Sequence, residues 1–151
     1  MENSLITLVE KLLKKNKISF DKKELAFQIQ SHPSYPSLHS ITGVLDHFNI
    51  ENVAADVPVN TNTLTQLPDC FIAQVENKGT KDLVLLVREK LEYSIFYSNK
   101  KKLKISENNF LKKFTGIIVA VEKTQENEQQ ANNKSKLFNT ITISLLTLLG
   151  L

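Results

Sequence analysis

Residues 31–50, SHPSYPSLHSITGVLDHFNI, divide the chain into a helical part and a stranded part. Each proline pushes the residue before it toward extended backbone, so a helix preceding this stretch ends by about His32. The apolar residues after the second proline recur at spacings of three and four: Leu38, Ile41, Leu45 and Phe48. This spacing predicts a helix with one buried face, capped at its N-terminus by Ser34 or Ser37.

Two further helices are predicted before this stretch. Leu5, Leu8 and Leu12 share one apolar helical face. A second helix is expected to end near residue 30, with Ser19 or Asp21 as its N-cap. The first part of the chain is therefore helical.

Beyond residue 50 the apolar residues alternate with a period of two, which predicts strands. The expected strands cover residues 53–57, 70–76, 83–87, 93–97 and 117–121. The strand at 93–97 is expected to be the more exposed one, with Leu103 and Ile105 pairing at its edge. A helical turn near Leu64 and a short helix capped by Ser106 complete an α+β domain over residues 1–122.

The composition changes after residue 122. Residues 123–136 are polar and without aromatics, so we expect a linker. Residues 137–151 are apolar and uncharged, and we expect them to begin a transmembrane helix that continues beyond the given chain. Lys134 and Lys136 would then keep the folded domain in the cytoplasm, at the cell membrane. The alternatives are an amphipathic tail docked on the domain and a freestanding soluble protein.

The charge and composition exclude several functions. The 151 residues carry 19 basic and 16 acidic side chains, a net charge of +3, which is too mild to predict nucleic-acid binding. A basic run at residues 99–104 is interpreted as a solvated hairpin tip, with a docking patch for an acidic partner or a lipid headgroup as the alternative. The single cysteine excludes an intrachain disulfide.

Few side chains are candidates for catalysis or metal binding. Cys70 begins a predicted strand, where no helix dipole lowers its pKa, so we expect a buried and unreactive thiol. His39 and His47 lie about two turns apart on one helix, and too few further ligands accompany them for zinc. His32 is expected to serve the turn before Pro33. Neither a metal nor another cofactor is therefore expected.

The order of a helical half followed by a sheet half is that of papain-like cysteine peptidases. The chain resembles the bacteriocin-processing cysteine peptidase domain at the N-terminus of ABC exporters, and more closely its cysteine-less relatives fused to membrane proteins. The resemblance covers residues 5 to about 123. It is carried by SYPSLHSITGVLDHFNIENVAADV, LTQLPDCFIAQV, DLVLLV and LKISENNFLKKFTGIIVAVE. It implies a papain-like fold, with N-terminal helices packed on an antiparallel sheet and, here, an apolar C-terminal helix.

The resemblance also implies where a catalytic set would lie. It places the nucleophilic cysteine near Ser4, the histidine at Asp82 and the orienting aspartate at about Tyr97. At each of these three positions the expected residue type is missing. A serine without a neighbouring base is a weak nucleophile. Activity in this chain is therefore uncertain, and the expected catalytic residues are absent.

The resemblance implies a non-catalytic recognition domain at the cytoplasmic N-terminus of a bacterial membrane protein. That membrane protein would be similar to vitamin K epoxide reductase or to an ABC exporter. The expected partner is a peptide, a substrate protein or another domain of the same polypeptide, bound by Tyr35, Ser37 and His39. For the function, the alternative is an active leader-peptide-cleaving peptidase. For the segment around Tyr35 to His39, the alternative is that the two prolines only end one helix and direct the next.

Overall fold

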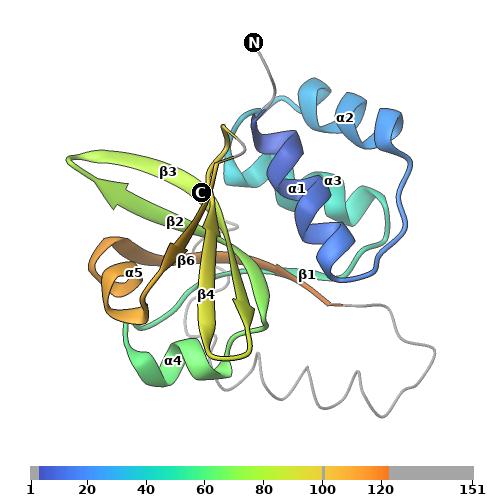
Figure 1. Cartoon of the computed structure of the whole chain (residues 1–151). Helices are drawn as coiled ribbons and strands as arrows, with labels where there is room; N and C mark the ends of the chain where they lie inside the picture. The colour runs from blue at the N-terminus through green and yellow to red at the C-terminus, as the bar shows by residue number, and fades with distance from the viewer. Residues whose placement is uncertain (1–3, 100, 123–151) are drawn as a thin grey trace.

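The computed structural model describes residues 4–99 and 101–122. The elements follow the predicted order of a helical part and then a mainly stranded part (Figure 1). They are α1 (Ser4–Lys15), α2 (Lys22–Ser31), α3 (Leu38–His47), β1 (Asn52–Asp56), α4 (Thr61–Gln66), β2 (Cys70–Asn77), β3 (Thr80–Glu89), β4 (Glu92–Phe96), β5 (Lys102–Ile105), α5 (Glu107–Lys113) and β6 (Phe114–Val121). The α+β prediction is confirmed.

The six strands form one antiparallel sheet in the order β1-β6-β2-β3-β4-β5. The middle of this order, from β2 to β5, is a meander of neighbouring strands. The last strand, β6, instead enters the sheet between β1 and β2, pairing with both. Residues at the two ends of the stranded part are thereby joined in one sheet.

Helices cover both faces of this sheet, as Figure 1 shows. The α1–α3 layer packs on one face, where Leu12 and Ile41 meet Ile72 of β2 and Leu85 of β3 in one buried core. On the other face α4 and α5 contribute Leu64 and Phe110 to a second core. Because side chains alternate along a strand, β2 and β3 supply apolar residues to both cores. This double covering explains their nearly continuous apolar sequences.

The stretch at residues 31–50 forms the turn between α2 and α3. Asp21 caps α2, which ends at Ser31, and the Tyr35–Pro36 peptide bond is cis. The backbone N–H of Ser34 donates to His32 Nδ1 at 3.1 Å, which confirms that His32 serves the turn. A β-carbon on Gly43 would lie 2.6 Å from His32 Nε2. The glycine inside α3 therefore makes room for this histidine.

Strand β4 differs from its prediction. It was expected to be the more exposed strand, yet Ser94, Ile95 and Phe96 are buried. The reason is its place in the sheet, because β3 and β5 pair with its two edges and each face carries a buried cluster. Exposure falls instead on β5, the short lysine-rich strand at the sheet edge.

The predicted linker and C-terminal apolar helix, residues 123–136 and 137–151, lie outside the described residues. Within residues 4–99 and 101–122, no helix combines the length and the apolar character needed to cross a bilayer.

Candidate functional site

A hollow of about 260 Å³ opens at the N-terminal end of α1, where it meets the sheet. We call it the α1 cleft. It is lined by Leu5, Leu8, Pro36, Lys81, Asp82, Leu83 and Ser98. These residues come from α1, from the turn before α3, from β3 and from the segment after β4.

The sheet register explains how the distant segments meet. Leu85 of β3 faces Phe96 of β4, so continuing the antiparallel register by two residues brings Ser98 opposite Leu83. Asp82 precedes Leu83 on the same strand and is exposed. The apolar face of α1, packed on β2 and β3, places Leu5 and Leu8 against this corner of the sheet. The cleft therefore includes Asp82, one of the positions that the resemblance assigns to a catalytic set, and lies beside the start of α1.

The three inferred catalytic positions come together only in part. Ser4 opens α1, beside the cleft residue Leu5, and Asp82 lines the cleft. Tyr97 does not line the cleft, because its side chain packs against the core on the α4 and α5 side of the sheet. The next residue, Ser98, turns to the α1 side instead, since successive side chains of an extended segment alternate.

The predicted binding residues Tyr35, Ser37 and His39 lie in the segment around Pro36, which lines the cleft. Tyr35 is half-buried and packs against the core beneath the α1–α3 layer. Ser37 is the N-cap residue of α3 without a side-chain cap bond, and its carbonyl accepts the hydroxyl of Ser40 at 2.5 Å. His39 is exposed on the first turn of α3. Of this segment, Pro36 is the residue that lines the cleft.

The chemical character of the α1 cleft follows from its lining. Leu5, Leu8, Leu83 and Pro36 give it apolar walls, and its polar side chains are one ammonium, one carboxylate and one hydroxyl. Neither a thiol nor an imidazole is among the lining residues. The arrangement can accept an apolar side chain and hydrogen-bond a peptide backbone. It lacks the thiolate and histidine pair that cysteine-peptidase chemistry requires.

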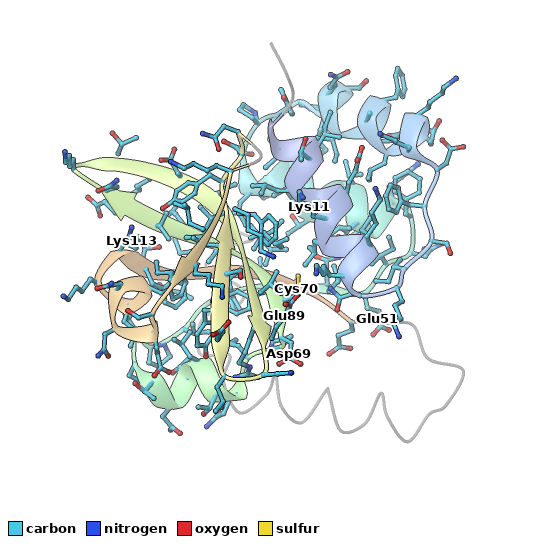
Figure 2. The ribbon with its side chains drawn as sticks, viewed as in Figure 1. Lys11, Glu51, Asp69, Cys70, Glu89 and Lys113 are labelled. Carbon is cyan, nitrogen blue, oxygen red and sulfur yellow. The ribbon has the colours of Figure 1, made fainter. Side chains whose placement is uncertain are left out.

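Cys70 lies elsewhere. It begins β2, is buried in the core beneath the α1–α3 layer, and lies on the sheet below Lys11 in Figure 2. Burial raises the pKa of Cys70 to about 12, more than the nearby Lys15 ammonium lowers it. Because Lys15 is the last residue of α1, the thiol lies toward the end of the helix opposite to Ser4. That helix end is about 16 Å from the cleft end at 1.5 Å per residue.

The histidines do not form a site either. His39 and His47 are exposed, while His32 is occupied by the turn. Within residues 4–99 and 101–122, no cluster of histidine, cysteine or carboxylate side chains has the grouping of a metal site.

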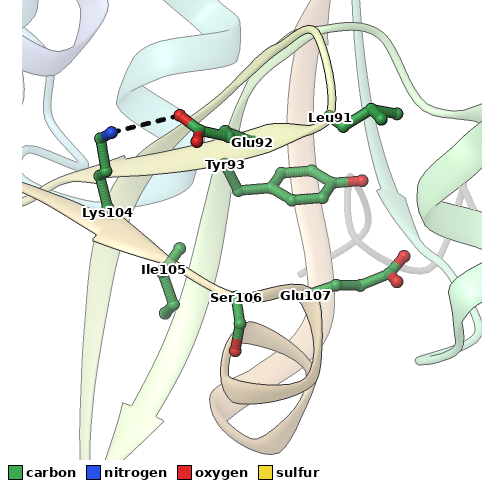
Figure 3. A pocket seen from close by; sticks show the side chains of 7 residues that line it. All are labelled: Leu91, Glu92, Tyr93, Lys104, Ile105, Ser106 and Glu107. Atoms are coloured by element: carbon green, nitrogen blue, oxygen red, sulfur yellow. Dashed lines mark ion pairs between the residues drawn. The ribbon is translucent and has the colours of Figure 1, made fainter.

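Another hollow, of about 410 Å³, lies at the far edge of the sheet between β4, β5 and the start of α5. Figure 3 shows the Tyr93 ring extending between Leu91 and Glu107, with the Glu92 to Lys104 ion pair at one end. That pair spans 3.3 Å, and both side chains are largely exposed. This hollow contains none of the positions that the resemblance assigns to catalysis.

Sequence reasoning located Asp82 and the start of α1, and it missed most of the cleft walls. Leu5 and Leu8 were read as core residues, which they also are. Lys81 carries no periodic signal, and the alternation that includes Ser98 does not show which face of the sheet meets α1. Only the pairing of β3 with β4 could have identified Ser98.

Comparisons with known proteins bear on the fold and the site. The sequence model of the Peptidase C39 family matches residues 2–126. The peptidase domain of Streptococcus ComA, a bi-functional ABC transporter involved in quorum sensing, is 12% identical with a TM-score of 0.62. That alignment covers 82% of this chain and 95% of the ComA domain.

Two more solved structures show the same fold. A double glycine motif protease from an AMS/PCAT transporter, in complex with a leader peptide, is 16% identical with a TM-score of 0.61, covering 82% of this chain and 88% of the protease. The Streptococcus mutans ComA peptidase domain is 12% identical with a TM-score of 0.53, covering 82% and 95%. No curated protein sequence shows significant similarity to the chain.

Proposed function

Because the chain belongs to the peptidase C39 family, we propose that it is a non-catalytic, peptidase-like recognition domain. It docks a peptide, a substrate protein or another domain of its own polypeptide in the α1 cleft. The observation that carries this proposal is the lining of the cleft. Asp82 lines the cleft where the family resemblance expects a histidine, Tyr97 at the place of the orienting aspartate packs on the other side of the sheet, and the cleft walls are apolar.

The lining supports binding without cleavage. Apolar walls with a few polar groups are typical of sites that fix an extended peptide. The resemblance places the nucleophile near Ser4, and the chain's one cysteine is buried in the core. A hydroxyl at that place, without an imidazole base, lacks the activation that acyl transfer needs.

The membrane context is part of the proposal. The apolar residues 137–151 and the preceding Lys134 and Lys136 support a domain held on the cytoplasmic side of the cell membrane. The relatives named above come from ABC transporters. The membrane partner of this chain is of that type or is similar to vitamin K epoxide reductase. Residues 123–136 would then act as a polar linker.

A fluorescence anisotropy assay with a labelled double-glycine leader peptide tests the docking function, because a relative was solved with such a peptide. The full chain should bind the peptide. Ser98→Trp should weaken binding by about ten-fold, which corresponds to about 1.4 kcal/mol, because the indole fills the cleft. Asn62→Trp, on exposed α4 beyond the opposite face of the sheet, is the matched control and should bind like the parent. Equal affinity of both variants would refute docking in the cleft.

The position of the recognition surface has its own test. If the segment before α3 contacts the partner, Tyr35→Ala and His39→Ala should each weaken peptide binding without lowering the melting temperature by more than a few degrees. Unchanged binding by both variants would restrict the surface to the cleft itself. The prolines would then only direct the helices.

The second candidate function is an active leader-peptide-cleaving cysteine peptidase, which the family membership favours. Mass spectrometry of the incubated leader peptide distinguishes it from the first. Our proposal requires an intact peptide. Cleavage that is lost in Cys70→Ala, together with labelling of native Cys70 by a thiol-alkylating probe, would establish the active peptidase instead.

A further inference from the structure

A hollow of about 440 Å³ lies beside α1, further toward its C-terminal end than the α1 cleft. We call it the lysine pocket. It is lined by Lys11, Lys14, Lys15, Leu85, Phe96 and Lys102. Three of its lysines come from α1 and one from β5, part of the basic run at the hairpin tip. The floor is formed by the buried side chains of Leu85 and Phe96.

The positive charges of this pocket converge. The ammonium of Lys11 lies 4.7 Å from the ring centroid of Phe96, and that of Lys102 lies 5.5 Å from the same centroid. Each cation is attracted by the electron-rich ring. The two cations repel each other, because they lie within about one Debye length, about 10 Å at 0.1 M salt. The fold thus holds like charges close together around an apolar floor.

Little in the protein neutralises this charge. Within residues 4–99 and 101–122, Lys15 is the only one of the four lysines paired with a carboxylate, that of Glu89 at 3.2 Å. Lys11, Lys14 and Lys102 remain available to an anion from outside. A ligand that brings carboxylates to this place would relieve the repulsion, and the apolar floor would accept a short apolar side chain.

The shape of the pocket discriminates between anionic partners. A membrane surface is contacted by protruding cations, whereas these lysines surround a hollow. A peptide segment with glutamate or aspartate beside an apolar residue matches both the charge and the floor.

The pocket adjoins the α1 cleft along the line where α1 packs on the sheet. Leu83 and Ser98 of the cleft are followed on the same face by Leu85 and Phe96 of the pocket. The last cleft residue on α1, Leu8, precedes Lys11 by one turn, or about 4.5 Å at 1.5 Å per residue. An extended peptide covers about 3.3 Å per residue. About two residues of an extended segment therefore bridge the nearest lining residues of the two sites.

We propose that the lysine pocket binds an acidic segment of the peptide or protein that docks in the α1 cleft. This inference rests on the proposed docking function and adds the chemistry of the partner. The acidic residues of the partner lie within a few residues of the part held in the cleft.

The test uses the full chain and two short fluorescein-labelled peptides, one of alternating glutamate and leucine, the other of alternating glutamine and leucine. The glutamate peptide should bind with an affinity that falls as salt is raised, and the glutamine peptide should bind at least ten-fold more weakly. K11Q/K14Q/K102Q should weaken binding of the glutamate peptide by about ten-fold, since the charge contacts of exposed Lys14 and Lys102 and half-buried Lys11 each contribute modestly. K22Q/K23Q/K112Q, which removes the same charge from exposed lysines of α2 and α5, should bind within two-fold of the parent.

Equal binding of both peptides, or equal loss in both triple variants, overturns the proposal. Vesicles of phosphatidylserine and phosphatidylcholine test the membrane alternative. If K11Q/K14Q/K102Q loses vesicle binding while its peptide binding is unchanged, the pocket faces a lipid surface and the proposal fails. The docking function is judged separately by Ser98→Trp and the leader peptide. Failure of the lysine variants alone overturns the acidic-segment proposal and leaves that function standing. Failure of Ser98→Trp alone refutes docking in the cleft, and with it the placement of the acidic segment beside the cleft.

Discussion

Replacing Gly116 by alanine should destabilise the domain far more than the same replacement at Gly79. Both glycines have positive φ, +97° at Gly116 and +81° at Gly79, so an alanine at either position is strained. This strain costs about 1–2 kcal/mol at each site. The two positions differ in their surroundings, which makes Gly79 a matched control.

The difference between them is a steric clash. A β-carbon at Gly116 would lie 2.6 Å from the carbonyl oxygen of Val57 and 2.9 Å from a carboxylate oxygen of Asp56, whereas nothing lies within 4 Å at Gly79. The carbonyl belongs to the backbone and cannot rotate away. The Val57 N–H also donates to the Gly116 carbonyl at 2.8 Å, so a shift that relieves the clash weakens this bond. Overpacking costs about 1–3 kcal/mol and the bond about 1 kcal/mol.

We therefore expect Gly79→Ala to lower the free energy of unfolding by about 1–2 kcal/mol and Gly116→Ala by about 3–6 kcal/mol. Urea denaturation followed by far-UV circular dichroism measures both values. The midpoint should fall while the slope stays the same if only stability changes. A Gly116→Ala variant no less stable than Gly79→Ala would refute the assignment of close packing between β6 and the end of β1.

Three further predictions concern Cys70, Arg88 and Gly43. Burial raises the pKa of Cys70 from 9.0 to about 12 in the folded protein, so the thiol's contribution to stability is complete below pH 9 and is lost as pH rises toward 12. Cys70→Ala should therefore flatten the plot of unfolding free energy against pH between pH 9 and 12. Native Cys70 should also alkylate at least a hundred-fold more slowly at pH 8 than in denaturant, and a rate ratio near one would contradict its burial. Arg88 donates two hydrogen bonds to the Asp69 carboxylate and two to carbonyls at the end of α4. Arg88→Lys should therefore lower the free energy of unfolding, measured by urea denaturation, by about 1–2 kcal/mol. Lys104→Gln at an exposed ion pair is the control and should lower it by less than about 0.5 kcal/mol. Gly43→Ala should destabilise the parent protein because the new methyl group meets the His32 ring, yet it should stabilise the His32→Ala variant by about 1 kcal/mol. A stability change of the same sign in both proteins would show that the His32 ring does not occupy the space beside Gly43.

Periodicity was sufficient to predict most of the fold. The helical spacing of Leu5, Leu8 and Leu12 and the period-two pattern after residue 50 placed the elements in the observed order. The predicted exposure of β4 was wrong, because alternation within a strand does not reveal that strands on both sides will pair with it. Ser94 is buried for this reason, although its own residue type favours solvent.

The site could be predicted less fully than the fold. The family resemblance led to Asp82, but the choice between Tyr97 and Ser98 depends on a single residue of register, which reverses the face on which a side chain lies. The lysine pocket could be predicted from the sequence even less. Lys102 and Lys11 meet over Phe96 only after β5 and α1 have packed beside β4. Local sequence carries no signal for such a meeting of distant residues.

The position of β6 inside the sheet determines when the domain can finish folding during synthesis. The strand is the last described element, yet it supplies the pairing partner of β1 and of the β2 edge that faces away from β3. Until Val121 has left the ribosome, β1 has no partner and one edge of the β2–β5 meander stays open. Such long-range closure is slow compared with local hairpin or helix formation. Nascent chains that stall before this point would therefore expose strand edges to chaperones and proteases, and resistance to proteolysis should arise in one step as β6 emerges.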